Sequence, residues 1–453
     1  MAYKLKKFIL QNREVIKSAR RLKKRIPQKQ ELFKSARRLK ILIPQRQERF
    51  KSTRKLKTFI PQTPEELSGE WFTNALKESG IITDSEVINF SISEPESGEG
   101  FSGVTLRVDL EWNFLEADAP ERVLLKFPSN DLKNRALLER DGTYDREFDF
   151  YERFSNQFPV RVPKLLFSIR DPIPDIESRR KLNKKIEHLP VGAAKFFGKH
   201  ARKLLRPSGR RYALMIEYID NARTTTTENF ASEEDLLQIL HSLAQVHAHW
   251  WKDPVLSDDD GVAWPTVTHT PKLMNGLYWG SRAQILENNS EIFTSDMVRA
   301  ADWFGNNAVE AVKFLNEPLA LLRGDTRTDN MLFTSEGLVM VDFGSFSSGR
   351  PACDVSLLLS SAVEAGPNAR DTMESLSDRY YESLLAFGVK DYSKLQFEND
   401  MKVGFALQAY LIMLAAGHYE AEYSGGSLVE LWARRIGGLI SKETPLLVDH
   451  VTV

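Results

Sequence analysis

Short segments in the first half of the chain either alternate between apolar and polar residues, as 104–112 does, or are short apolar runs, and both patterns predict β-strands. In the second half the apolar residues recur every three or four positions, which predicts helices. A chain in which strands precede helices in this way is expected to have an α+β fold. The predicted strands cover residues 88–92, 104–112, 123–126, 160–167 and 211–219. Helices are expected from Ser232 to about residue 251 and near 292–315, 369–387, 399–418 and 427–441.

The first 61 residues have a different pattern, a 17-residue unit that is repeated four times. Pro27, Pro44 and Pro61 lie one period apart, so the segments between them are predicted to be helices. Each helix would be amphipathic and basic, with an apolar stripe opposite lysines and arginines. Beyond the repeats the composition becomes ordinary, and Thr63 is predicted to cap a helix that has Pro64 in its first turn.

Charge also separates the repeats from the rest of the chain. Residues 1–61 hold 21 Lys or Arg against three Glu, a net charge of +18, which leaves −18 for the remaining residues. A second basic segment, residues 179–211, holds twelve Lys or Arg and one Glu. The repeats could bind an anionic membrane surface, together with 179–211, or could be a duplicated lead-in that lies on the acidic body. A transit peptide is less consistent with a repeat, and the sparse aromatic residues argue against nucleic acid as a partner.

The composition indicates a globular, cytoplasmic protein. Its 453 residues are 42% hydrophobic, which is enough for the cores of two or three domains. No run of about eighteen uncharged apolar residues is present, and the first seventeen residues lack the apolar core of a signal peptide. Cys353 is the single cysteine, so no intramolecular disulfide can form and a reducing compartment is expected.

The segment with the clearest chemistry is residues 321–344, LLRGDTRTDNMLFTSEGLVMVDFG. Two short apolar strands joined by a turn at 335–337 predict a hairpin that begins after Asn330 and ends at Asp342. Asp325 precedes Asn330 by five residues, so the three side chains are expected at one end of the hairpin. Phosphoryl transfer requires one carboxylate for the attacking hydroxyl, and a second carboxylate with an amide oxygen for Mg²⁺. The pattern therefore predicts Asp325 as catalytic and Asn330 and Asp342 as metal ligands.

A second group of candidates lies in the predicted sheet. Gly98, Gly100 and Gly103 form a GxGxxG sequence that a strand follows, whereas a dinucleotide-binding fingerprint would require a helix there. Backbone N–H groups of such a loop can cover phosphates, although a simple glycine hairpin is the alternative. Lys126 ends an apolar strand and resembles the phosphate-binding lysine of the kinase small lobe, whose usual partner is a glutamate on the following helix; Glu147 is the best match for that glutamate. The alternative for both charges is exposure to solvent.

This ordered set of motifs resembles the aminoglycoside phosphotransferase and choline kinase-like family of small-molecule kinases, which includes the ecdysteroid kinase-like proteins. The resemblance covers roughly residues 62–453 and implies a bilobal, protein kinase-like fold that uses ATP and Mg²⁺. It also implies that Asp354 supports the catalytic loop from behind. Arg323 stands where the family has His, so the loop departs from the family pattern at this position.

The resemblance divides the chain into the repeats (1–61), an N-lobe (62–220, with a basic insert at 171–211) and a helical C-lobe (221–453). A protein kinase would have a long activation segment ending in A-P-E after D-F-G, but here Asp354 follows Asp342 by only twelve residues. The implied function is therefore the phosphorylation of a hydroxyl group on a small molecule. The alternative, suggested by Arg323 and the basic segments, is an impaired kinase fold that acts as a binding or membrane-associated scaffold.

Overall fold

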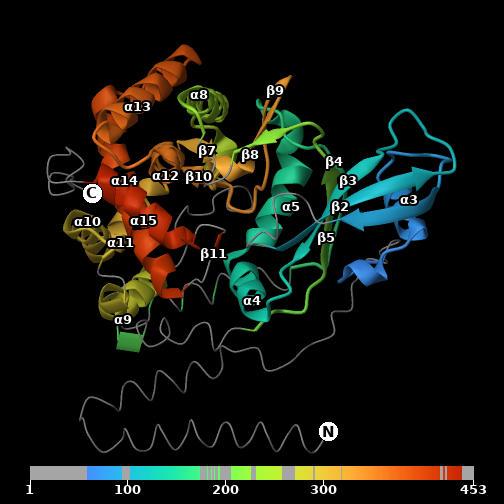
Figure 1. Cartoon of the computed structure of the whole chain (residues 1–453), viewed down its shortest axis with the longest axis horizontal. Coiled ribbons are helices and arrows are strands. Elements are labelled where there is room, and N and C mark those ends of the chain that lie inside the picture. Colours follow the sequence, from blue (N-terminus) through green and yellow to red (C-terminus); the bar gives the residue numbers. More distant parts are fainter. Residues whose placement is uncertain are drawn as a thin grey trace, which may run out of the picture. The chain divides into compact units, whose positions relative to one another are not determined.

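The N-terminal part of the computed structural model is built on a five-stranded antiparallel sheet in the order β1-β2-β3-β5-β4 (Figure 1). The structure describes residues 59–93, 103–173, 206–225, 231–257, 271–288, 291–317, 319–418, 422–423 and 426–440, with a few isolated residues between 181 and 193. They belong to one compact unit, Lys51–Val453. The strands are β1 (Val87–Ser93), β2 (Gly103–Trp112), β3 (Arg122–Pro128), β4 (Leu165–Arg170) and β5 (Tyr212–Glu217), and the helices are α3 (Gly69–Glu78), α4 (Leu132–Asp141) and α5 (Thr143–Arg153).

Alternation along β5 explains how the sheet is covered on both faces. Met215 lies in a core with Phe72 of α3, whereas the next residue, Ile216, lies in a different core with Phe148 of α5. Successive side chains of a strand point to opposite faces of the sheet. Because the first five residues of β5 are all buried and apolar, both faces of the sheet must be covered by other elements. Helix α5 thereby lies between the sheet and the helical region (Figure 1).

The helix predicted from Thr63 begins later than expected. Pro64–Glu66 form only a short 3₁₀ helix, and the Thr63 side chain makes no capping hydrogen bond. Leu67 is extended, and the N-cap of α3 is Ser68, whose hydroxyl accepts the N–H of Trp71 at 3.1 Å. A second capping residue close to the first therefore determines where the helix starts.

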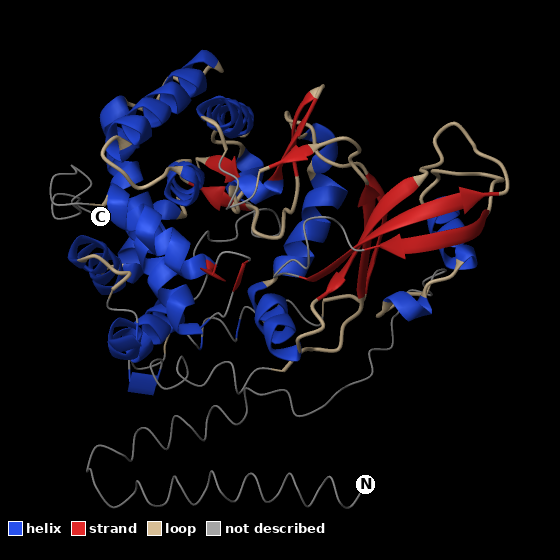
Figure 2. Cartoon of the chain, viewed as in Figure 1, coloured by secondary structure: helices blue, strands red, loops and turns tan. Residues whose placement is uncertain are grey.

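The C-terminal part is mainly helical (Figure 2). Ser232 caps α8 as predicted, through a reciprocal capping box with Asp235. The predicted helix near 292–315 is two helices, because the chain turns at Asn307. The sequence pattern did not predict α4, α9 or α12. The helices are α8 (Glu233–His249), α9 (Pro271–Asn288), α10 (Ser295–Asn306), α11 (Ala308–Leu315), α12 (Ala352–Ala362), α13 (Ala369–Ala386), α14 (Lys394–His418) and α15 (Leu428–Leu439).

Small sheets accompany these helices. The predicted hairpin consists of β8 (Met331–Thr334) and β9 (Gly337–Met340), and β8 also pairs with β6 (Arg223–Thr224). A second pair joins β7 (Ala320–Leu322) to β10 (Ser347–Gly349), and a third joins β11 (Glu422–Tyr423) to β12 (Gly426–Ser427). The first two pairs hold both ends of the segment that carries the predicted catalytic residues.

The antiparallel sheet followed by a mainly helical region confirms the predicted α+β class. The strand predicted at 160–167 is wrong in its start, since β4 begins at Leu165, after Pro163, which cannot donate a ladder hydrogen bond. The basic repeats and most of the basic insert lie outside the described residues, so the predictions made for them stay predictions. Within the described ranges, no helix is both long and apolar enough to cross a membrane.

Candidate active site

The predicted catalytic loop begins directly after β7 with a tight turn at Gly324. Its backbone is in the left-handed region, with a φ of +91°, and a Cβ at this position would lie 1.9 Å from the carbonyl oxygen of Ser345. Only glycine can place the loop this close to the backbone that follows D-F-G. The Arg-Gly-Asp order therefore serves the fold, because it brings Asp325 beside the metal-binding hairpin.

Asp354 at the start of α12 holds the loop from behind, as the resemblance implied. Its carboxylate accepts the N–H groups of Arg323 at 2.7 Å and Gly324 at 3.0 Å. The same carboxylate lies 3.2 Å from Nε2 of His247, whose Nδ1 lies 2.7 Å from the hydroxyl of Tyr380. All of these groups are buried. His247 thus lies in the core as part of this hydrogen-bonded support.

Arg323 replaces the family histidine with a different kind of brace. Its side chain is fully buried, and Nη1 and Nη2 donate to the carbonyl oxygens of Asp325 and Val341. The guanidinium also lies 5.4 Å from the ring centroid of Phe343. Burial lowers its pKa, because the charged form loses its hydration. Arg323 thus joins the catalytic loop to the D-F-G segment by hydrogen bonds to the backbone.

Asp325 forms a two-point ion pair with Arg327, two residues further along the loop. Nε of Arg327 donates to Oδ1 at 2.8 Å, and Nη2 donates to Oδ2 at 2.7 Å. Burial alone would raise the pKa of Asp325, but the charges of Arg327 and Arg323 outweigh it and hold the pKa below its ordinary value. Asp325 is therefore ionised at neutral pH. Arg327 was not among the predicted site residues, although its place two residues after the candidate Asp was a usable signal.

Asn330 and Asp342 lie beside this loop. The side-chain amide of Asn330 donates through Nδ2 to the carbonyl of Asp325 at 3.1 Å, which leaves its oxygen as the atom suited to a cation. The backbone N–H of Val341 donates to the carbonyl of Asn330 at 3.1 Å, so the residue before Asp342 is tied to the loop. Asp342 itself has a φ of 63°, a conformation that non-glycine residues adopt mainly at turns and functional sites.

Lys126 and Glu147 form the predicted pair, with Nζ and Oε1 2.5 Å apart. The same ammonium group lies 3.9 Å from Oδ1 of Asp342, so β3 and the hairpin contribute to one site. Burial alone would lower the pKa of Lys126, but the carboxylates of Glu147 and Asp342 outweigh it and raise the pKa. Lys126 therefore keeps its charge.

Helix α5, which carries Glu147, is fastened to the D-F-G segment by a neighbouring arginine. Nε of Arg146 donates to the carbonyl of Gly344 at 2.8 Å. A Cβ at Gly344 would lie 2.7 Å from Cγ2 of Thr143, so the glycine permits α5 to approach closely. Arg146 was not predicted as a site residue, because a charged residue in a helix carries no sequence signal of a contact almost two hundred residues away.

The glycine-rich sequence is described only at its end. Gly98 and Gly100 lie outside the described residues, and Gly103 is the first residue of β2. A Cβ at Gly103 would lie 2.2 Å from the carbonyl oxygen of Phe127, so close pairing of β2 with β3 accounts for this glycine. The role predicted for the loop in phosphate binding stays a prediction.

These residues fit a magnesium nucleotide. Among the described residues no group of three or more His, Cys, Asp or Glu side chains is arranged to hold a metal ion. Asn330 and Asp342 would therefore supply only part of a coordination shell. Mg²⁺ typically takes one or two protein carboxylates and completes its shell with water and nucleotide phosphates. A site that needs phosphate oxygens to be complete matches this donor set.

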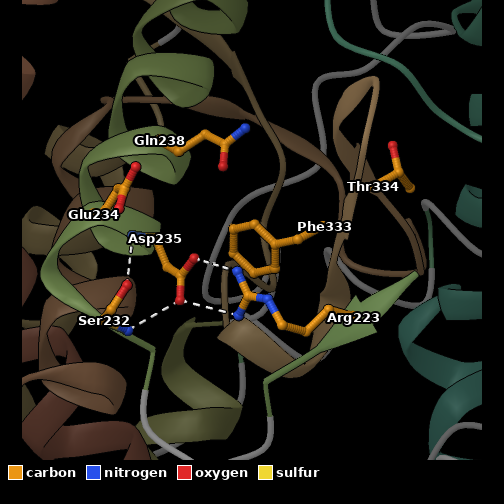
Figure 3. A pocket seen from close by; sticks show the side chains of 7 residues that line it. All are labelled: Arg223, Ser232, Glu234, Asp235, Gln238, Phe333 and Thr334. Carbon is orange, nitrogen blue, oxygen red and sulfur yellow. Dashed lines mark hydrogen bonds and ion pairs between the residues drawn. The ribbon is translucent and has the colours of Figure 1, made fainter. Parts of the chain in front are cut away.

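A separate pocket lies at the start of α8 and contains none of the predicted site residues (Figure 3). Arg223 crosses it and donates to both oxygens of Asp235, at 3.1 and 2.6 Å. Its guanidinium lies 4.4 Å from the ring centroid of Phe333. Because Arg223 and Asp235 pair with each other, this pocket is a packing junction between α8 and the hairpin.

The family model DUF1679, whose description reads "Uncharacterized oxidoreductase dhs-27", matches residues 181–421. A search of curated protein sequences found no match. Among solved structures, choline kinase from Cryptosporidium parvum Iowa II is 11% identical, with 77% of this chain and 88% of that chain covered and a TM-score of 0.45. Plasmodium vivax ethanolamine kinase is 10% identical, with 82% and 86% covered and a TM-score of 0.43. An amicoumacin kinase in complex with AMP-PNP, Ca²⁺ and Ami is 13% identical, with 82% and 94% covered and a TM-score of 0.45.

Proposed function

This chain belongs to the DUF1679 family, and we propose that it is a phosphotransferase that uses ATP and Mg²⁺ to phosphorylate a hydroxyl group of a small molecule. The observation that carries this proposal is the meeting of two predicted groups in one site. Lys126 lies on β3 and Glu147 on α5, whereas Asp325 and Asn330 lie in the loop before the hairpin and Asp342 lies directly after it. A lysine held by a carboxylate beside two candidate metal ligands is the arrangement that phosphoryl transfer requires.

Each residue has a defined task in this proposal. ATP would supply the phosphoryl group, and Mg²⁺ would offset the charge of its phosphates. Lys126 would bind the phosphates while Glu147 keeps its ammonium group in place, and Asn330 and Asp342 would hold the metal ion. Asp325 would orient the acceptor hydroxyl and take its proton as the acceptor oxygen bonds to the terminal phosphorus, while the bond from that phosphorus to the bridging oxygen breaks and ADP leaves.

The path of the chain after the hairpin favours a small acceptor. Helix α12 begins at Ala352, and Asp354 in its first turn is already bonded to the catalytic loop. Protein substrates of kinases are bound by a long activation segment, and the ten residues from 342 to 351 include β10 and the turn into α12. This short connection supports a small hydroxylated molecule as the acceptor.

The family description mentions an oxidoreductase, but the described sheet does not support dinucleotide chemistry. A Rossmann site places its glycine fingerprint between a strand and a helix of a parallel sheet. Here Gly103 leads directly into β2, which pairs antiparallel with β1 and with β3. The geometry around Lys126 and Asp342 therefore favours phosphoryl transfer over hydride transfer.

Nucleotide binding tests the proposal without a known acceptor. ATP with Mg²⁺ is expected to stabilise the full chain, by about 2.7 kcal/mol when the nucleotide is at one hundred times its Kd. The shift should disappear with EDTA and should be strongly reduced in Lys126→Met. Lys77→Met on α3 is the matched control, because Lys77 contacts Glu86 on the far side of the sheet. If wild-type protein shows no shift with ATP and Mg²⁺, the impaired scaffold is the better description.

A further inference from the structure

The two arginines that flank Asp325 are held in different ways. The side chain of Arg323 is fully buried and donates to backbone carbonyls. These carbonyls cannot move away from Arg323 unless the backbone itself changes its conformation. The side chain of Arg327 is 23% exposed and donates to the side-chain carboxylates of Asp325 and Asp329. Phosphate oxygens can replace carboxylate oxygens as acceptors for a guanidinium, in the same two-point geometry. Arg327 therefore has partners that an anionic ligand can replace.

The pairing also occupies the group that the reaction needs. Both oxygens of Asp325 accept hydrogen bonds from Arg327, at 2.8 and 2.7 Å. An acceptor hydroxyl would have to compete with a guanidinium for the same carboxylate. A charged donor is a stronger partner than a hydroxyl, so the pair has to loosen before Asp325 can orient the hydroxyl well.

Arg327 lies beside a candidate metal ligand, because its partner Asp325 accepts the side-chain amide of Asn330 at its carbonyl oxygen, at 3.1 Å. Burial alone would lower the pKa of Arg327, but the carboxylates of Asp325, Asp329 and Asp342 outweigh it and raise the pKa, so Arg327 stays charged. On the face of its guanidinium, the ring centroid of Trp432 in α15 lies 5.3 Å away. The aromatic ring supports the cation without using its N–H donors, which leaves these donors for exchange between acceptors.

We propose that Arg327 binds the terminal phosphate of the nucleotide, and that in the absence of nucleotide Asp325 holds Arg327 in reserve. The inference rests on the proposed function and adds that the nucleotide binds before Asp325 can engage the acceptor. Binding of the terminal phosphate draws the guanidinium away from Asp325, and Asp325 then becomes available to the acceptor hydroxyl. Arg327 afterwards stabilises the charge of the phosphoryl group that is transferred.

The inference predicts that Arg327 distinguishes ATP from ADP, because ADP lacks the terminal phosphate. Affinities for both nucleotides with Mg²⁺ would be measured by calorimetry on the full chain. Arg327→Gln should weaken ATP binding about ten- to hundredfold, the range for a charged hydrogen-bonded pair, and leave ADP binding unchanged. Arg327→Lys, which keeps the charge but loses the two-point geometry, should lie between Arg327→Gln and the wild type. Thermal melting of the nucleotide-free variants shows whether each is folded. If Arg327→Gln does not fold, the comparison of ATP with ADP is made with Arg327→Lys alone.

Removing the competing carboxylate gives the opposite result. Asp325→Asn should raise the affinity for ATP, and this gain should be smaller when Arg327 is already Gln, as a double-mutant cycle would show. A purely structural Arg327 predicts equal losses of ATP and ADP affinity, or no loss, and that result would overturn the inference while leaving the proposed function intact. A wild-type chain that binds neither nucleotide would overturn the proposed function, and the inference with it.

Discussion

The two sides of the candidate site each contain a cation paired with a carboxylate, but the proposed ligand-binding partner is the cation in one pair and the carboxylate in the other. On the sheet side, Glu147 lies on α5 and contacts the single ammonium group of Lys126. On the loop side, Arg327 grips both oxygens of Asp325. In the first pair the carboxylate positions a cation for the ligand. In the second, the cation covers a carboxylate that the reaction would use.

The difference shows why similar ion pairs do not imply similar roles. Glu147 lies on α5, and the adjacent residue Arg146 donates to the carbonyl of Gly344 and so fixes the helix. The sheet-side pair is therefore positioned by contacts outside the ligand site. Among the described residues, Arg327 pairs with carboxylates of its own loop and lies over the ring of Trp432. We therefore expect substitutions on the sheet side to weaken all phosphate ligands and those on the loop side to be selective.

The largest effect is expected at the two aspartates of the loop side. Asp325→Asn should lower phosphate transfer about 10²- to 10⁴-fold, the usual contribution of a general base, without a loss of nucleotide affinity. Asp342→Asn should lower both, because a ligand of the metal acts in the ground state and in the transition state alike. Turnover with an acceptor found by screening hydroxylated metabolites, together with ATP affinity, would measure this. Wild-type turnover in Asp325→Asn would show that the loop is not catalytic.

The next effect concerns Arg323 and is one of stability. Arg323→Met removes donors to two backbone carbonyls in a buried site, and each unsatisfied group costs about 1–3 kcal/mol, partly offset because no charge is then buried. We expect a loss of roughly 2–4 kcal/mol in the free energy of unfolding, measured with urea. Arg379→Met on α13 is the control, since its pair with Glu382 is exposed and should contribute little.

Arg323→His asks whether the family residue can replace this brace. Imidazole is too short to reach both carbonyls, so the variant should also be destabilised, although less than Arg323→Met. If Arg323→His is as stable as the wild type, the hydrogen bonds to Asp325 and Val341 make no net contribution to the free energy of unfolding. The departure from the family pattern would then be neutral for the fold.

Local patterns made most of the fold and the hairpin predictable. The alternating segment at 104–112 became β2, other predicted strands became β1, β3 and β5, and Asp325, Asn330 and Asp342 follow from strand ends that are close in sequence. Contacts over long sequence separations were not predictable in the same way. Arg146 meets Gly344, and His247 meets Asp354, only after the sheet and the helical region pack together. The pairing of Arg327 with Asp325 could have been predicted, since the two residues lie two positions apart. Whether two such neighbouring charges pair, however, depends on the turn that Gly324 permits.

The smallest effect is expected on the sheet side, where Glu147→Gln removes a charge that positions Lys126 but no group that touches the phosphates. We expect a loss of about tenfold in affinity, close to 1.4 kcal/mol and typical of one hydrogen bond to a charged group. ATP and ADP should be affected equally, because the phosphates that Lys126 is proposed to bind are present in both nucleotides. Glu152→Gln, on the same helix but bonded to Ser168 and Arg170, is the matched control and should leave both affinities unchanged. Selective loss of ATP in Glu147→Gln would contradict the contrast between the two pairs, because the sheet side would then also read the terminal phosphate.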